Sequence, residues 1–331
     1  MPLITELKQV KELYAEASGN EWVLPAFNAE DLTSTEAILA ATKDYGDSIG
    51  RKDIPIIIGI TVNYDHRSQA VLYSHARQWE LGLKLFMSDL ELLTSEGSPY
   101  SKIRVMVHLD HVQLDINKDF LNNWDMSRFS SIMYDASELS LKENIEKTAS
   151  YVEKNNGIIL IEGACDEINA SADNFTTPDV AENYFRETGV DIIVANLGTE
   201  HRADAATLQY KDELARKITK RIGGRICLHG TSSVSKSNLT ELFHDGIRKV
   251  NIWTALERDT VPVLFKDMLE NAAKVIGPKK AEEWVASGLL GSKADQSSSL
   301  SLKYFTTNYR QNIIFNEMKK VVNSYLEMWY R

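Results

Sequence analysis

Short apolar segments alternate with amphipathic segments along most of the chain. Each apolar segment has the length and the Val, Ile and Leu content of a strand buried on both faces, as in a parallel sheet. The pattern therefore predicts eight strands in one parallel arrangement. The predicted strands are Val23–Asn28, Ile54–Thr61, Ile103–His111, Ser130–Asp135, Gly157–Glu162, Asp191–Leu197, Arg225–His229 and Lys249–Thr254.

The segments between these strands repeat apolar residues with a helical period of 3.6. Pro178 stands where one helix would begin, and Gly189, Gly223 and Gly246 follow the expected ends of three others. The clearest predicted helices are Thr33–Tyr45, Leu141–Asn155, Asp179–Thr188, Lys211–Arg221 and Lys236–Asp245.

Eight strand–helix units in one chain favour a (β/α)8 TIM barrel over a doubly wound open sheet. The first strand is followed by FNAEDL, which lacks the glycine-rich turn usual in a doubly wound nucleotide-binding sheet. We expect a single TIM-barrel domain over residues 1–331, with the barrel at about 20–270. Additional C-terminal helices are expected at about 280–331, with a loop at 297–299 and a last helix at Asn312–Met328.

Composition and charge narrow the class of protein. The net charge of −10 over 331 residues, without a basic block, argues against a nucleic-acid or acidic-membrane surface. Only Cys165 and Cys227 are present, outside any CxxC motif, which favours buried free thiols in a reducing cytoplasm. The N-terminus reads as a charged amphipathic helix, and no apolar run is long enough to span a membrane.

Polar residues cluster at the ends of the predicted strands. In a barrel enzyme those ends converge on one mouth, where the chemistry occurs. A single polar residue there often caps the next helix, but a ring of buried polar groups needs a ligand or mutual partners. The residues are Asn28, Thr61, Asp110, His111, Asp135, Glu162, Glu200, His201, His229 and Asn251.

Three histidines in this ring predict a metal site. His111, His201 and His229 end the third, sixth and seventh strands, and three imidazoles with an open fourth position are typical of catalytic zinc. Asp135 and Glu162 end the strands between, where they would orient histidines or hold a second metal position. His108 competes with His111, because residues 108 and 110 share one face and His111 joins Asp110 at the mouth only if the strand ends there.

The same segments resemble the class II fructose-bisphosphate aldolase family, in order, from about residue 3 to residue 270. HLDH at 108–111 resembles HLDHG, and MYDAS at 133–137 resembles MxDAS. LGTEH at 197–201 resembles LGSVHG, LHGTSS at 228–233 resembles LHGGTG, and VNIWT at 250–254 resembles INVNT. FNAEDLTSTEAIL near residue 27 is similar to the family's first strand and helix.

The resemblance implies roles for these residues. His111, His201 and His229 would bind one catalytic Zn2+, and Asp135 and Glu162 would be the acidic residues of the metal site, leaving open a second divalent or monovalent cation. Asp110 would be the proton donor in aldol synthesis and the base in cleavage. A phosphorylated ketose would be bound by residues of three strand-end loops. The implied substrate-binding residues are Asn28, Arg202, Gly230, Thr231, Ser232, Ser233, Asn251, Trp253 and Thr254.

Several positions depart from the family pattern. The loop after Glu162 reads EGACDEINASAD, without paired glycines, so the residue that moves the carbon-bound proton is Asp166, Glu167 or Asp173, and we take Glu167 as the candidate. Arg202, Thr231 and Ser233 replace family glycines, and Trp253 replaces a small Asn or Asp. The metal centre is thus kept while the substrate pocket is altered.

The resemblance implies a cytoplasmic lyase of carbohydrate metabolism that acts on a small sugar phosphate and assembles as a homo-oligomer, a dimer or a tetramer. It would cleave the ketose reversibly into dihydroxyacetone phosphate and an aldehyde through an enediolate. One alternative is a TIM-barrel metallohydrolase, but the first strand lacks an HxH pair and the eighth offers Asn251 instead of aspartate. The other is a non-catalytic sugar-phosphate-binding homologue, which only the altered loop supports.

Overall fold

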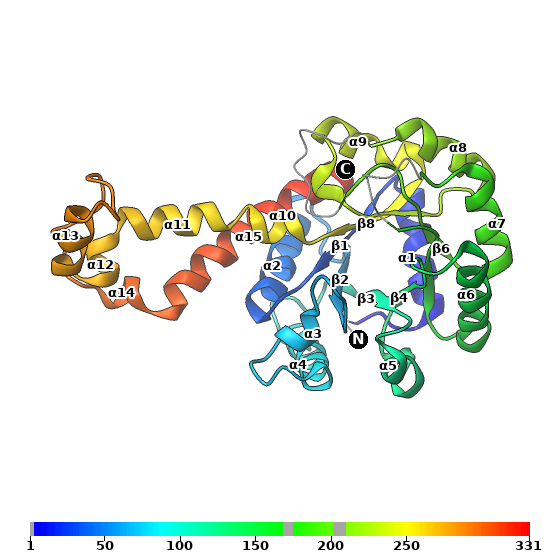
Figure 1. The fold of residues 1–331 in the computed structure, drawn as a ribbon, viewed down its shortest axis with the longest axis horizontal. Helices are drawn as coiled ribbons and strands as arrows, with labels where there is room; N and C mark the ends of the chain where they lie inside the picture. The colour runs from blue at the N-terminus through cyan, green and yellow to red at the C-terminus, as the bar shows by residue number, and fades with distance from the viewer. Residues whose placement is uncertain (1–2, 168–174, 201–209) are drawn as a thin grey trace.

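The computed structural model describes residues 3–167, 175–200 and 210–331. Within them, eight parallel strands close into a barrel in sequential order, which confirms the predicted (β/α)8 fold (Figure 1). The strands are β1 (Leu24–Asn28), β2 (Pro55–Thr61), β3 (Arg104–Gln113), β4 (Ser131–Asp135), β5 (Leu160–Ala164), β6 (Ile192–Val194), β7 (Ile226–Leu228) and β8 (Ile247–Ile252).

Helices surround the barrel, as the amphipathic segments predict (Figure 1). They bury their apolar stripes against the strands, and those stripes follow the helical period read from the sequence. The barrel helices are α1 (Leu7–Gly19), α2 (Leu32–Ser48), α3 (Gln69–Leu72), α4 (Trp79–Leu93), α5 (Lys118–Asn123), α6 (Leu141–Asn155), α7 (Pro178–Thr188), α8 (Asp212–Ile222), α9 (Lys236–Asp245) and α10 (Thr254–Arg258), with short 3-10 turns at η1 (Met126–Arg128) and η2 (Thr231–Ser233).

The helix ends follow the chemistry of the sequence. Ser140 caps α6 in a capping box with Glu143, and Gly189 and Gly246 end α7 and α9 in the left-handed conformation.

The last two predicted strands are shorter than expected at their C-terminal ends. Trp253 follows β8 directly and is the residue before the first turn of α10, in a segment that lines the pocket at the mouth of the barrel.

Helix α1 closes the opposite, N-terminal end of the barrel. Glu16 on α1 accepts hydrogen bonds from Arg104 at the start of β3, at 2.7 and 2.9 Å. Ile4 donates its backbone N–H to Val105, at 2.8 Å, and so extends the contact. The mouth opposite α1 is the end where the polar residues gather.

A helical arm projects from the barrel after α10 (Figure 1). It has a small apolar core of its own, in which Ala273 and Ala281 are buried, and its last helix returns to pack along α2. That helix begins five residues before the predicted start, at Thr307. The arm consists of α11 (Val261–Glu270), α12 (Ala272–Ile276), α13 (Pro278–Ala286), α14 (Leu302–Phe305) and α15 (Thr307–Trp329).

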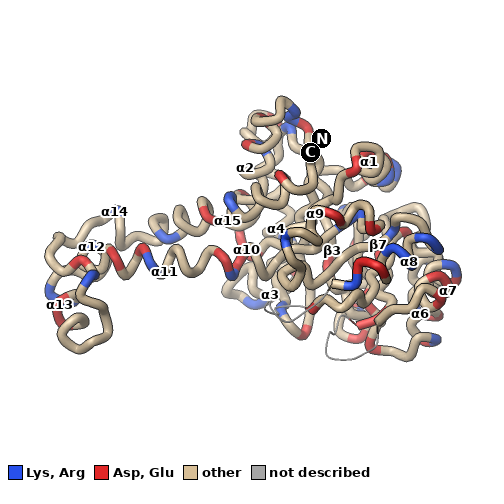
Figure 2. The backbone as a smooth tube through the Cα atoms, turned by 90° about the horizontal axis from the view of Figure 1, so that it is seen from above, with Lys and Arg blue, Asp and Glu red and all other residues tan. Residues whose placement is uncertain are grey.

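Charges of both signs are interspersed over the barrel helices and the arm (Figure 2). Many pair locally, for example Lys43 with Asp47 and Arg216 with Asp212, each four residues apart on one helix face. Among the described residues, no helix is long and apolar enough to cross a membrane.

Candidate metal and substrate site

A distortion of β3 brings Asp110 and His111 together at the mouth. The strand does not end at His111 but continues to Gln113, and its register with β4 shifts between Leu109 and Val112. His111 has a φ of 45°, in the left-handed region that a non-glycine residue rarely adopts. This bulge lets two consecutive side chains serve the same site, which regular strand alternation would forbid.

His108, the competitor of His111, lies deeper in the barrel. Its Nδ1 is 2.8 Å from Ser131 Oγ, and its Nε2 is 3.1 Å from the Lys249 ammonium. An ammonium only donates, so His108 Nε2 accepts and Nδ1 carries the hydrogen. Both nitrogens of His108 are therefore engaged below the mouth, whereas His111 reaches the mouth itself.

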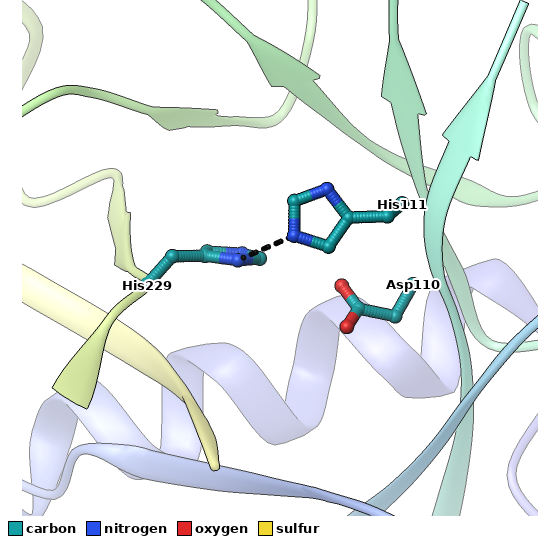
Figure 3. A group of neighbouring side chains, drawn as sticks. All are labelled: Asp110, His111 and His229. Atoms are coloured by element: carbon teal, nitrogen blue, oxygen red, sulfur yellow. Dashed lines mark hydrogen bonds between the residues drawn. The ribbon is translucent and has the colours of Figure 1, made fainter. Parts of the chain in front are cut away.

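His111 and His229 face each other across the mouth (Figure 3). His111 Nε2 lies 3.2 Å from His229 Nδ1, and both residues are buried. Two nitrogens bound to one tetrahedral zinc ion at about 2.05 Å would stand about 3.3 Å apart. The pair therefore fits two adjacent ligand positions, and Asp110, His111 and His229 all place a ligand atom within 4.8 Å of one another.

Asp135 holds His111 in the orientation that this arrangement needs. Its Oδ2 lies 3.1 Å from His111 Nδ1, which leaves Nε2 toward His229. Ser137 donates from its backbone N–H and its hydroxyl to the other Asp135 oxygen, at 3.1 and 2.6 Å. A carboxylate that accepts a hydrogen bond from a metal-binding histidine is common in metal sites. Of the two roles predicted for Asp135, the geometry favours orientation of a histidine over a second metal position.

The ionisation of these groups is coupled. Burial favours a lower pKa for His111, but the carboxylates of Asp110 and Asp135 outweigh it and the pKa is raised. Burial alone would raise the pKa of Asp110, yet the neighbouring His111 and His229 hold it well below its usual value. Asp110 is therefore a carboxylate at neutral pH, able to accept a proton.

Two asparagines fix the Asp110 carboxylate. Asn28 on β1 donates to Oδ2 and Asn251 on β8 donates to Oδ1, both at 2.7 Å. Asn251 is itself oriented by Lys249, whose ammonium lies 2.7 Å from the Asn251 carbonyl oxygen. The three strands together leave the carboxylate little freedom to rotate.

Glu162 lies below the mouth and is paired with Lys249. Both side chains are completely buried, and Nζ of Lys249 is 2.9 Å from the Glu162 carboxylate. Burial favours a lower pKa for Lys249, but Glu162 and Asp110, among the groups around it, reverse the effect and the pKa is raised. Sequence reasoning missed Lys249; the signal was its position two residues before Asn251, on the same inward face of β8.

The loop after β7 forms one wall of an open pocket at the mouth. Gly230 has a φ of 67°, and Thr231 donates its hydroxyl hydrogen to the backbone carbonyl oxygen of Asn251, at 2.8 Å. Ser233 points back into the loop and donates to the Gly230 carbonyl, at 2.7 Å, so it supports the loop and does not line the pocket. The predicted substrate-binding residues that line the pocket are Asn28, Gly230, Thr231, Ser232, Asn251, Trp253 and Thr254.

The opposite wall contains residues that sequence reasoning did not assign to the site. Tyr64 stacks on the His111 imidazole, with ring centroids 4.5 Å apart and planes 7° apart. Trp253 donates its indole N–H to Glu30 at 2.7 Å, and Arg67 donates to the same carboxylate. The loop that carries Tyr64 and Arg67 has no motif resemblance, so only spatial proximity reveals its part in the site.

Other predicted residues lie elsewhere. His201, Arg202 and Asp173 are outside the described residues. Glu167 is exposed and does not line the pocket, although its charge contributes to the raised pKa of Glu138, which burial mainly causes. Asp166 accepts a hydrogen bond from the Thr176 hydroxyl, at 2.6 Å.

We predict that Gly230→Ala disturbs substrate binding. A methyl group there would lie 2.8 Å from the Glu200 backbone nitrogen, in addition to the strain of a positive φ, about 1–2 kcal/mol. The loop would have to shift, and we expect KM for a phosphorylated substrate to rise by about 10-fold, an effect of about 1.4 kcal/mol.

Gly157→Ala is the matched control for this variant. Gly157 has a φ of 80°, but nothing lies within 4 Å of the position its Cβ would occupy. Thermal unfolding should therefore detect backbone strain in both variants, whereas KM should change only in Gly230→Ala. An equal KM effect in both would show that the loop contact with Glu200 is unimportant.

The fold and the site together define a parallel (β/α)8 barrel whose mouth holds a cluster of groups able to bind a metal ion, Asp110, His111 and His229. A family model described as fructose-bisphosphate aldolase class-II matches residues 8–328. The chain belongs to the class II fructose-bisphosphate aldolase family, and it is therefore an aldolase, a carbon–carbon lyase of carbohydrate metabolism.

Two relatives agree with this assignment. The chain is 26% identical over 262 residues to a fructose-bisphosphate aldolase of Treponema pallidum, covering 71% of this chain and 72% of that protein. It is 24% identical over 289 residues to the enzyme of the same name from Staphylococcus epidermidis, covering 85% and 91%.

Two solved structures share the fold. The fructose-bisphosphate aldolase of Campylobacter jejuni superposes with a TM-score of 0.73 at 20% identity, covering 99% of this chain and 95% of that one. The YdjI aldolase of Escherichia coli K12 has a TM-score of 0.66 at 16% identity, covering 97% and 96%.

Proposed function

We propose that this aldolase uses one zinc ion to cleave a phosphorylated ketose reversibly into dihydroxyacetone phosphate and an aldehyde. The observation that carries the proposal is the pair of facing imidazole nitrogens of His111 and His229, 3.2 Å apart beside the buried Asp110 carboxylate. Family membership supports the reaction type, and His201 is the third imidazole that we propose for the ion.

The groups at the mouth would have separate roles in the reaction. A bound zinc ion supplies Lewis acidity that draws electron density from the substrate carbonyl. Asp110, held by Asn28 and Asn251, is placed to take the proton from the substrate hydroxyl as the carbon–carbon bond breaks, and to return it in synthesis. The bond electrons leave with the dihydroxyacetone phosphate half as its enediolate, and the hydroxyl-bearing carbon becomes the aldehyde.

An acidic residue must then protonate the enediolate carbon. Glu167 is our candidate, with Asp166 and Asp173 as the alternatives in the same segment. We propose that the pocket loops at Gly230–Ser233 and Asn251–Thr254 hold the donor phosphate through backbone N–H groups and the hydroxyls of Ser232 and Thr254, both of which line the pocket. The role of Arg202 in substrate binding remains a prediction. The homo-oligomeric state and the cytoplasmic location of the enzyme are predictions as well.

Two measurements test the function. Metal analysis of the purified protein should give about one zinc ion per chain, as expected for a three-histidine site. An NADH-linked assay should then detect dihydroxyacetone phosphate released from ketose phosphates, and removal of the metal by a chelator should abolish release. Turnover that persists without metal would reject the proposed chemistry.

We predict that fructose 1,6-bisphosphate is not the preferred substrate. Trp253 lines the pocket where the family has a small polar residue, and its N–H is occupied by Glu30. Arg67 is paired with the same carboxylate, so its charge is already compensated. This wall suits a shorter or less polar aldehyde than one that carries a second phosphate.

Steady-state kinetics on a panel of ketose mono- and bisphosphates checks the prediction. We expect the highest kcat/KM for a monophosphate, and Trp253→Asn should raise kcat/KM for the bisphosphate relative to it by about 10-fold or more. If fructose 1,6-bisphosphate is the best substrate of the wild-type enzyme, the altered specificity is wrong and the common family activity is right.

A further inference from the structure

A buried ammonium group occupies the space directly beneath the proposed zinc site. Lys249 Nζ lies 2.9 Å from the Glu162 carboxylate, 2.7 Å from the Asn251 carbonyl oxygen and 3.1 Å from His108 Nε2. The Cys227 sulfur is 3.7 Å away. The side chain of Lys249 is completely buried, so these groups replace its hydration shell.

Two of these groups, Glu162 and Cys227, belong to a second cluster of metal-binding type. Glu162, Cys227 and His229 place one ligand atom each within 4.8 Å of one another, as do Asp110, His111 and His229 nearer the mouth. His229 belongs to both clusters. We call the cluster of Glu162, Cys227 and His229 the inner position, and the cluster of Asp110, His111 and His229 the outer position.

The inner position already contains a positive charge from the protein, the Lys249 ammonium, that contacts its members. The Lys249 ammonium touches two members of the inner position, Glu162 and Cys227, and pairs with the only carboxylate there. A divalent ion in the inner position would displace that pairing and meet a buried positive charge within a few ångströms, where little water screens the repulsion. The outer position instead gathers the Asp110 carboxylate and two imidazoles.

We propose that the Lys249 ammonium is the built-in cation of the inner position and excludes a metal ion from it, which confines the metal to the outer position. The proposal rests on the proposed function for the outer metal site. It also gives Cys227 a defined state: a buried thiol that contacts the ammonium and binds no metal as long as Lys249 is present.

The test uses Lys249→Met, which keeps the apolar stem and removes the charge. Without the ammonium, Glu162 is a buried, uncompensated carboxylate beside a thiol and an imidazole, a set that suits zinc or cobalt. We expect metal analysis to rise from about one zinc ion per chain in the wild-type protein to about two in the variant. The cobalt-loaded variant should gain a thiolate-to-cobalt charge-transfer band in the near ultraviolet, which the cobalt-loaded wild-type protein lacks.

Two double variants are the controls. Lys249→Met combined with Cys227→Ser should lose the charge-transfer band, because the band requires the Cys227 thiolate. Lys249→Met combined with Glu162→Gln removes both buried charges together, which a core tolerates better than an unpaired one. This second variant should fold and return to about one ion per chain, since the inner position then lacks its carboxylate.

The outcomes separate this inference from the function on which it rests. If the wild-type protein binds no metal at all, the proposed function fails. Even then, one cobalt ion per chain with a thiolate charge-transfer band in Lys249→Met would support the inference about the inner position. A charge-transfer band in the cobalt-loaded wild-type protein would overturn the inference, as would a folded Lys249→Met that binds one ion without the band. If Lys249→Met folds only when zinc is added, that rescue supports the inference; if it does not fold even then, the wild-type cobalt spectrum decides.

Discussion

Replacing His229 by alanine should abolish metal binding and, with it, aldol cleavage. His229 is buried, and its Nδ1 faces His111 Nε2 at 3.2 Å, so the substitution removes one of the two described imidazoles that converge on the outer position. Two remaining imidazoles hold zinc poorly, and the family's chemistry needs the ion's Lewis acidity. Metal analysis should fall from about one ion per chain to near zero, with turnover below detection.

His244→Ala is the matched control, because His244 lies exposed on α9. That variant should keep both its metal and its activity. Circular dichroism should show both proteins folded, since both histidines lie outside the strands of the closed barrel. Full metal occupancy in folded His229→Ala would exclude His229 from the metal site.

Replacing Asp110 by asparagine should leave the metal and the fold in place while it reduces kcat by roughly 10²- to 10⁴-fold, the usual contribution of a positioned proton-transfer group. The neutral amide keeps the shape of the carboxylate but cannot accept the substrate proton. The fold should tolerate the change, because the buried carbonyl oxygen of Asn28 has no hydrogen-bond partner among the described residues and a flipped Asn28 can accept from the new amide.

Asp47→Asn, on the exposed face of α2, controls for the loss of a carboxylate as such. It should show wild-type kcat and metal content. The decisive combination is a folded Asp110→Asn enzyme with about one ion per chain and a large loss in kcat. Near-normal turnover in that enzyme would assign proton transfer to another residue.

Much of the architecture was predictable because it depends on local patterns. Strands buried on both faces read as continuous apolar runs, and those runs fixed the number and the order of the barrel strands. The ring of polar residues was also predictable, because the ends of the strands can be read from the same local patterns. Its members Asn28, Asp110, His229 and Asn251 all line one pocket, as expected for a barrel mouth. The prediction of Trp253 as a pocket residue was of the same kind.

The residues that surround this ring of polar strand ends, Tyr64, Arg67 and Lys249, were less predictable. Tyr64 and Arg67 lie in a loop whose path depends on tertiary packing, so their approach to His111 and Trp253 left no sequence signal. Lys249 was hidden for a related reason. A lysine in a strand reads as solvated, and here Glu162 and His108, 87 and 141 residues away in the chain, make burial tolerable.

The sequence by itself determined the barrel, the end of the barrel that carries the chemistry, and most of the residue types found there, because strand parity and helical period are properties of neighbouring residues. Only the tertiary structure decided between His108 and His111. Strand alternation places Asp110 with His108, and the bulge that turns His111 to the mouth exists through the pairing of β3 with β4, which shifts between Leu109 and Val112. Pairing between strands also placed a lysine beneath the histidines, since only a closed barrel brings β3, β5, β7 and β8 around one ammonium group.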